Sequence, residues 1–350
     1  MTDSIPPDGP LPESIGRLAE LIGGDPLAGL DADMAAVLAM LEQLGARPLE
    51  TLSPEVARRQ PTLADAVAAL MARAGAGAGD DGVASEDVTI AGSAGDLAAR
   101  IYRPAALLPR LNPLVLYFHG GGFVTGDLDS HDGSARALAR RTGAIVLSVA
   151  YRLAPENPWP SAHDDAWAAW AWLGSQAHRL AGDPRRMAVA GEDAGANLAA
   201  HVALRARDGR SHRPLHQILI HPMAGTDLTA PSYGETLRLR LLGMPAMRWR
   251  LRQILADGPP ESEPLLQLAK RTDLAGLAPT TIILAQIDPL RSEGQALAEA
   301  LQQAGVPVTC SIYEGVGQGF FGQGGVVTRA LFAQGEVGDA LTRAFAVPVR

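Results

Sequence analysis

A seven-residue segment, GEDAGAN at 191–197, has the spacing of a catalytic turn but an unusual residue at its centre. In the pattern G-x-S-x-G, a sharp strand-to-helix turn presents a serine hydroxyl as a nucleophile. Asp193 stands at the position of that serine. Because a carboxylate is a poor nucleophile toward esters, this turn indicates either lost acyl-transfer chemistry or different chemistry.

A glycine-rich segment, HGGG, follows the apolar run PLVLYF. Glycines allow backbone N–H groups to approach a ligand closely, which is what an oxyanion hole requires. We therefore expect a binding cradle here, built from His119, Gly120, Gly121 and Gly122. Within it, we expect His119 to make structural hydrogen bonds rather than act as a base. The alternative is a glycine-rich turn with no binding role.

Five motifs occur in order along the chain: HGGG, YRLAPENPWPSAHDD (151–165), GEDAGAN, IDPLRSEG (287–294) and GVGQGFF (315–321). Through these motifs, over about residues 85–345, the chain resembles the hormone-sensitive lipase-like family, the bacterial family IV esterases of the α/β-hydrolase fold. That family carries GDSAGGN, DPLRDEG and GxxHGF. These motifs supply a serine, an aspartate and a histidine in the chain order that the fold requires.

The resemblance implies a catalytic triad in which two of the three side chains are replaced. Asp193 takes the serine position, Asp288 keeps the aspartate, and Gln318 takes the histidine position. The oxyanion donors correspond to the backbone amides of Gly121, Gly122 and Ala194. Since glutamine cannot remove a proton near neutral pH, we predict that ordinary serine-esterase activity is absent or very weak. The sequence contains no second G-x-S-x-G segment.

These residues leave three classes of function open. The first is a non-catalytic protein that binds a small acyl or carbonyl ligand, with Asp193 a tolerated acid. The second is a repurposed enzyme, and the third is residual or unusual hydrolysis.

The repurposed enzyme has two versions. Haloalkane dehalogenases and epoxide hydrolases place an aspartate nucleophile at this turn, and a histidine then activates water. Here the only histidine that we place near a neighbouring strand end is His221, for which a structural role is the commoner alternative. In the other version, Asp193 and Asp288 lie close together, bridged by Gln318. The pKa of one acid then rises, and a protonated Asp193 serves a lyase or isomerase as a general acid.

Composition excludes several other classes. The 350 residues are 47% hydrophobic and 19% charged, as in a globular protein with a large core. The net charge of −8 provides no basic field for nucleic acid. Cys310 is the only cysteine, so no intramolecular disulfide forms, and its apolar surroundings predict a buried, inert thiol. We predict no cofactor and no metal site.

The location of the protein is predicted from what its sequence lacks. No stretch approaches 18 apolar residues, and residues 1–16 do not have the pattern of a signal peptide. We expect a cytoplasmic protein without a membrane partner. Whether the protein forms a homodimer is left open.

The elements that must position these residues alternate along the chain. Short apolar runs predict strands at 88–92, 97–102, 113–119, 144–150, 187–191, 217–221, 280–286 and 308–313. Amphipathic segments at 134–143, 197–209 and 293–305 lie between them. The pattern predicts an α/β fold with about eight mostly parallel strands, flanked by helices and covered by a helical lid. Catalytic groups belong at the carboxyl ends of such strands.

We expect three segments along the chain. Residues 1–30 form a loosely ordered arm, residues 31–84 form lid helices and a linker, and residues 85–350 form the hydrolase domain with a lid insertion at about 225–265. The lid helices are predicted at 31–45 and 62–75. In the insertion, we expect leucine, methionine and tryptophan to face an acyl pocket. We expect five arginines to face water, with binding of a ligand carboxylate or phosphate as the alternative: Arg238, Arg240, Arg248, Arg250 and Arg252.

Overall fold

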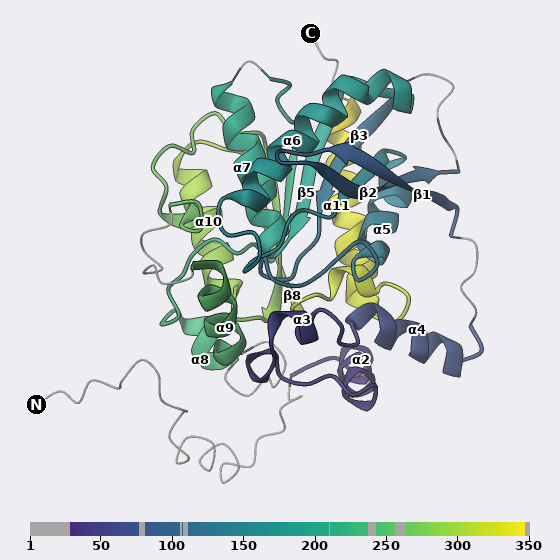
Figure 1. The fold of residues 1–350 in the computed structure, drawn as a ribbon, viewed down its shortest axis with the longest axis vertical. Helices are drawn as coiled ribbons and strands as arrows, with labels where there is room; N and C mark the ends of the chain where they lie inside the picture. Colours follow the sequence, from purple (N-terminus) through teal and green to yellow (C-terminus); the bar gives the residue numbers. More distant parts are fainter. Residues whose placement is uncertain are drawn as a thin grey trace, which may run out of the picture.

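One eight-stranded sheet forms the centre of the molecule (Figure 1). The computed structural model describes residues 29–76, 81–105, 107, 111–209, 211–236, 243–255 and 264–346. The strands are β1 (Val83–Ala91), β2 (Asp96–Pro104), β3 (Asn112–Phe118), β4 (Ile145–Val149), β5 (Gly182–Glu192), β6 (Gln217–Ile220), β7 (Thr280–Ile287) and β8 (Val308–Gly317). Each coincides with one of the eight predicted strands.

The sheet is mostly parallel, in the order β1-β2-β4-β3-β5-β6-β7-β8. Only the β1–β2 and β2–β4 pairs are antiparallel. Because the other strands run in one direction, the loops that follow β3, β5, β6, β7 and β8 meet at one edge of the sheet. This edge carries the candidate site residues of four motifs: HGGG, GEDAGAN, IDPLRSEG and GVGQGFF.

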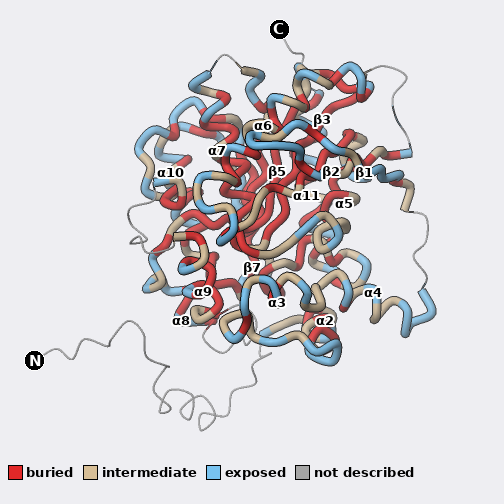
Figure 2. Tube along the Cα trace, viewed as in Figure 1, coloured by how far each residue is buried: buried red, intermediate tan, exposed pale blue. Residues whose placement is uncertain are grey.

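Helices cover both faces of the sheet, and this explains why its strands are continuous apolar runs. The helices α6 (Ser161–Gln176), α7 (Ala194–Asp208) and α10 (Arg291–Gln303) pack on one face, and α5 (Asp132–Thr142) and α11 (Thr328–Ala346) pack on the other (Figure 1). In β3, Leu114 and Leu116 join the first core cluster, whereas Val115 and Tyr117 join the second. Alternate side chains of one strand thus enter two cores. Figure 2 shows the buried residues gathered along the central strands.

A second group of helices lies across the carboxyl edge of the sheet (Figure 1). It comprises α2 (Ala32–Gln43), α3 (Pro54–Ala57), α4 (Leu63–Arg73), α8 (Pro231–Glu235) and α9 (Met244–Leu255). The predicted helices at 31–45 and 62–75 are α2 and α4, and a capping box between Thr62 and Asp65 begins α4. Trp249 of α9 donates a 3.0 Å hydrogen bond to the carbonyl of Leu52. The insertion is therefore joined to the N-terminal helices.

Short 3-10 turns complete the described elements: η1 (Leu49–Thr51), η2 (Ala177–Leu180), η4 (Leu268–Lys270) and η5 (Phe321–Gln323). The predicted arm lies outside the described residues except for Gly29 and Leu30. Parts of the predicted linker and lid insertion, at 77–80, 237–242 and 256–263, also lie outside them. The proposed segment boundaries stay a prediction.

Cys310 is exposed, so the prediction of a buried thiol was wrong. The residue lies in β8, which is the last strand of the sheet and pairs only with β7. All six residues at 308–313 are exposed or only partly buried, including the 42% exposed Ile312. An apolar run at a sheet edge is not covered as fully as one at the centre.

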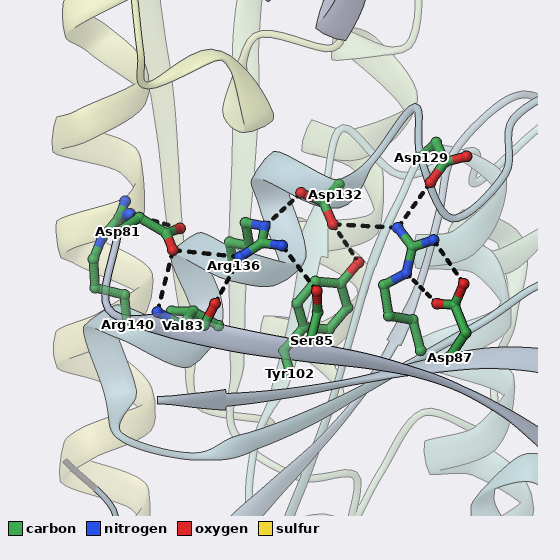
Figure 3. Close-up of polar contacts among 10 residues, drawn as sticks. Asp81, Val83, Ser85, Asp87, Tyr102, Asp129, Asp132, Arg136 and Arg140 are labelled. Carbon is green, nitrogen blue, oxygen red and sulfur yellow. Dashed lines mark hydrogen bonds and ion pairs between the residues drawn. The ribbon is translucent and has the colours of Figure 1, made fainter. Parts of the chain in front are cut away.

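A polar network fixes the start of α5 against the first two strands (Figure 3). Asp132 accepts hydrogen bonds from the Tyr102 hydroxyl at 2.9 Å and from Nε of Arg136 at 2.5 Å. Arg100 of β2 donates to both Asp87 of β1 and Asp129 in the loop before α5. The loop at 127–131, which borders the site described next, is thereby held in place.

Candidate functional site

The backbone of Asp193 is held in a turn that few residues adopt. It lies between β5 and α7 with φ 52° and ψ −114°, outside the regions that L-residues prefer. Its N–H donates to the Ile220 carbonyl at 3.0 Å. A Cβ atom at Gly191 would lie 2.1 Å from the carbonyl oxygen of Gly195, so the tight turn requires glycine at 191. The turn places the Asp193 side chain, only 3% exposed, at the carboxyl edge of the sheet.

The carboxylate of Asp193 occupies the HGGG cradle. Its Oδ2 accepts hydrogen bonds from the backbone N–H groups of Gly121 at 3.0 Å and Gly122 at 2.9 Å. The Ala194 N–H, the third predicted donor, is not among the donors to this oxygen. The two N–H groups of the predicted cradle therefore bind an oxygen of the protein itself.

Arg250 of α9 also contacts this carboxylate, so the prediction that it faces water was wrong. Its Nη1 lies 3.3 Å from Asp193 Oδ2, and the residue is 4% exposed. Met247, Arg250 and Ile254 lie on one helical face because they are three and four residues apart, and all three are buried. This spacing is the sequence feature that could have identified Arg250 as a buried residue.

The other predicted lid arginines follow the expectation where the structure describes them. Arg248 and Arg252 are exposed. Arg238 and Arg240 lie outside the described residues.

His221 follows β6 and faces an acid that the sequence interpretation did not identify. Its Nε2 lies 3.4 Å from Oε2 of Glu192, in ion-pair range but without hydrogen-bond geometry. Burial disfavours the charged imidazolium, but Glu192 outweighs burial and raises the pKa of His221. Burial would likewise raise the pKa of Glu192, whereas His221 and His131 together lower it to about 2. The Tyr117 hydroxyl donates to Glu192 Oε1 at 2.6 Å. Glu192 and His221 thus form a buried acid–histidine pair.

Asp288 and Gln318 follow β7 and β8, and both are buried. Asp288 Oδ1 accepts from the Leu290 N–H at 2.8 Å, and Oδ2 has no partner among the described residues. Burial raises the pKa of Asp288 to about 6. The Gln318 amide makes no hydrogen bond to any residue that the structure describes, so the expected bridge between Asp193 and Asp288 is not formed.

His119 has the environment expected of a structural histidine. Its Nδ1 lies 2.7 Å from the Gly120 carbonyl oxygen, and its ring stacks on Tyr151 at a centroid distance of 4.3 Å. Burial and the nearby His131 lower the pKa of His119 to about 4. The ring is therefore neutral near neutral pH.

A cavity of about 210 Å³ opens onto these groups. Its apolar wall comes from the N-terminal segment: Leu38, Leu41, Leu49, Ala57 and Leu63. Its polar wall includes Glu192, Asp193, His221, Arg250, Gln318 and His131. For the described residues of the insertion, the expectation that apolar side chains line an acyl pocket was wrong, whereas residues 237–242 lie outside the described part. Met247, Trp249 and Leu251 of α9 instead pack into the core cluster.

Two negative findings apply to the described part of the chain. No cluster of three or more histidine, cysteine, aspartate or glutamate side chains there could hold a metal ion. None of the helices in the same part combines the length and apolarity needed to cross a membrane.

Comparisons with known proteins agree with this architecture. The sequence profile of a family described as alpha/beta hydrolase fold matches residues 115–322. Esterase LipI of Mycobacterium tuberculosis is 41% identical over 249 residues, which are 70% of this chain and 77% of LipI. Carboxylesterase NlhH of the same organism is 40% identical over 254 residues, 71% of this chain and 79% of NlhH. A thermostable esterase from Pseudomonas putida superposes with a TM-score of 0.81 at 29% identity, covering 93% of this chain and 100% of that one. The chain therefore belongs to the hormone-sensitive lipase-like esterases, as an α/β hydrolase of the carboxylesterase and lipase type.

Proposed function

We propose that this protein does not perform serine-esterase catalysis and instead binds a small acyl or carbonyl ligand in the cavity. The observation that carries the proposal is the pair of hydrogen bonds from Gly121 and Gly122 to Asp193 Oδ2. An ester is hydrolysed through a tetrahedral intermediate whose oxyanion needs these donors. Here the donors are committed to a carboxylate, and Arg250 adds a charge that holds it there.

The triad positions support the same proposal. Asp193 offers no hydroxyl to acylate, and Gln318 cannot accept the proton that a serine mechanism transfers to its base. We infer that the triad is degenerate, with only Asp288 of the usual side chains present. Removing the serine or the histidine alone from such a unit costs about 10⁶-fold in turnover.

The cavity supports a ligand with an apolar body and one polar group. Leucine and alanine side chains of the N-terminal segment form one wall. Gln318 also lines the cavity; it is 5% exposed, and its amide nitrogen and oxygen have no partner within the described residues. A buried amide without a partner is unfavourable, and a ligand carbonyl that accepts from Nε2 would satisfy it.

The catalytic part of the proposal is tested with p-nitrophenyl acetate and butyrate. We expect hydrolysis no faster than the background that survives loss of triad members, about 10³ to 10⁴ over water. Turnover of ordinary esterase magnitude that persists on re-purification and disappears in Asp193→Asn would contradict the proposal.

The binding part is tested by calorimetric titration with hexanamide, an unreactive acyl compound. Leu38→Trp places an indole in the cavity and should abolish binding. Leu44→Trp is the matched control, because Leu44 ends the same helix but is 40% exposed and outside the cavity. Equal binding by both variants would refute a ligand site in this cavity.

A second candidate is a repurposed enzyme in which Asp193 takes part as an acid, a base or a nucleophile. The observation that favours it is Asp193 Oδ1, which is buried but has no hydrogen-bond partner among the described residues. A buried carboxylate oxygen without a partner is unfavourable, and a substrate group that donates a hydrogen bond to it would satisfy it.

We also propose the cellular and structural context. The net charge of −8 supports a protein without a nucleic-acid partner, and we propose a cytoplasmic location. Residues 31–84 and the insertion at about 225–265 are proposed to act together as the lid, which the contact between Trp249 and Leu52 supports. Cell fractionation tests the location, and analytical ultracentrifugation tests whether the protein forms a homodimer.

A further inference from the structure

A flap, residues 47–60, connects α2 to α4 and forms one side of the cavity. Its Leu49 and Ala57 belong to the apolar cavity wall. Leu52 and Ala57 are its only buried residues, and its backbone–backbone hydrogen bonds join flap residues to one another. By contrast, α2 buries four residues in the second core cluster. The flap is therefore held to the molecule less by packing than α2 is.

The side chain of Gln60 closes the base of the flap. Its Oε1 accepts from the Arg47 N–H at 2.6 Å, and its Nε2 donates to the Arg47 carbonyl at 3.1 Å. These two bonds tie the ends of the flap to each other, as in a compact surface loop. Such a loop moves as a unit when the contacts that hold it to its surroundings are released.

Two side chains join the flap to the body of the molecule. Among the residues that the structure describes, every hydrogen bond between the flap and residues beyond α4 involves either Trp249 or Arg58. Trp249 donates to the Leu52 carbonyl at 3.0 Å, from a helix that itself belongs to the proposed lid. Arg58 therefore makes the contact between the flap and the loops of the hydrolase domain.

The Arg58 guanidinium reaches three acceptors at once. Nε donates to the Val124 carbonyl and Nη2 to the Ala154 carbonyl, both at 2.7 Å. Nη1 and Nη2 also donate to the two carboxylate oxygens of Glu156, at 2.8 and 2.6 Å. Val124 follows the HGGG segment, and Ala154 and Glu156 belong to the motif at 151–165, which takes no part in the proposed function. Serving all three acceptors requires the planar fork of donors that arginine has and lysine lacks.

We propose that Arg58 is a latch that holds the flap closed over the cavity, and that small molecules enter when it releases Val124 and Ala154. The two carbonyls are fixed points, because Val124 and Ala154 are 0% and 4% exposed and lie in the first core cluster. The ion pair with Glu156 is the weaker part of the latch, because its side chains are 26% and 54% exposed and water screens them. Arg58 is thus a positioning residue. The latch goes beyond ligand binding, and it does not depend on what the cavity binds.

The first experiment measures flap opening by the reactivity of a single thiol. Cys310 is the only cysteine, and Cys310→Ser removes it. Ala57→Cys then places a thiol on the covered side of the flap, where Ala57 is 7% exposed. Adding Arg58→Met should raise the rate of its alkylation by iodoacetamide at least ~10-fold, because one hydrogen bond to a charged group is worth about this factor. Arg59→Met is the matched control and should leave the rate unchanged, because the Arg59 side chain is 76% exposed and pairs with Glu55 of the flap itself.

Two conservative variants divide the latch into its parts. Arg58→Lys keeps the charge but not the fork, so it should raise the alkylation rate nearly as much as Arg58→Met. Glu156→Gln removes the exposed ion pair but leaves both carbonyls, so it should raise the rate by no more than about 5-fold. A larger effect of Glu156→Gln than of Arg58→Lys would contradict the role of the two carbonyls.

The dependence on urea separates flap opening from unfolding. Opening exposes little surface, so the alkylation rate should change little up to ~1 M urea, whereas a rate set by global unfolding rises steeply. This measurement remains informative if an Arg58 variant is less stable. The proposal is overturned if Arg58→Met leaves the alkylation rate of the Ala57→Cys thiol unchanged, or raises it only with the steep urea dependence of unfolding.

The entry of a ligand, which rests on the proposed function, is measured with hexanamide. NMR line shapes should show that hexanamide exchanges faster between the free and bound states with Arg58→Lys than with Arg59→Met. If hexanamide binds both variants and exchanges equally fast, the flap does not gate the cavity. If it binds neither variant nor the wild type, the proposed function fails, and the alkylation rates still decide whether Arg58 is a latch.

Discussion

The buried pair of Arg250 and Asp193 yields a quantitative prediction about stability. Both side chains are about 5% exposed or less, and Nη1 lies 3.3 Å from Oδ2. Removing one partner of a buried ion pair costs about 3–5 kcal/mol, because the other charge is left uncompensated. In Arg250→Met, the carboxylate keeps its two backbone N–H donors. We therefore expect the lower end of this range, about 3 kcal/mol.

The reverse change, Asp193→Asn, leaves the guanidinium without its anion and should cost a similar amount. The double variant should lose less than the sum of the two single changes, with a coupling of about 1–3 kcal/mol. The free energies of unfolding are measured by urea denaturation. The slope of the unfolding free energy against urea concentration is compared between variants, to check that they unfold in the same way.

The control is Arg248→Met, which removes an arginine from the exposed face of the same helix. It should change the free energy of unfolding by no more than about 0.5 kcal/mol. The ion pair does not stabilise the site if the losses in unfolding free energy of the two single variants simply add up in the double variant. The same conclusion follows if Arg250→Met loses no more stability than the Arg248→Met control.

Two further predictions concern pH and the triad positions. The pKa of Asp288 is raised by burial to about 6, against an ordinary 3.8, so the folded state binds the proton more tightly than the unfolded state. This contribution is complete below about pH 4 and is lost as pH rises through 6, amounting to about 3 kcal/mol. Melting temperatures should thus fall over this window for wild type relative to Asp288→Asn, and parallel curves would refute the effect. Separately, Asp193→Ser with Gln318→His restores a nucleophile and its base and removes Oδ2 from the cradle. Hydrolysis of p-nitrophenyl butyrate should rise by at least ~10²-fold over wild type, while either single change does little because the members act as a unit. A folded double variant without gain would count against a dormant esterase site.

The sequence alone determined the fold to a large extent. All eight strands and the helices α2, α4, α5, α7 and α10 lie where apolar periodicity predicts them. These elements can be predicted because their signals lie within short segments. A strand buried on both faces must be apolar throughout, and a helix that packs on the sheet must carry apolar residues at helical spacing. The positions of Asp193, Asp288 and Gln318 at strand ends follow from the same pattern.

Only the tertiary structure decided how these residues are used. Arg250 reaches Asp193 from 57 residues away, and His221 meets Glu192 across neighbouring strand ends. Among the described residues, the N-terminal segment rather than the insertion supplies the apolar cavity wall. Cys310 is exposed because β8 ended up at the edge of the sheet. These outcomes depend on the order of the strands and on how the lid docks, neither of which is encoded in the periodicity of a single segment. The sequence thus determined that an acid stands at the turn, and the tertiary structure decided that its carboxylate accepts from the backbone N–H groups of Gly121 and Gly122.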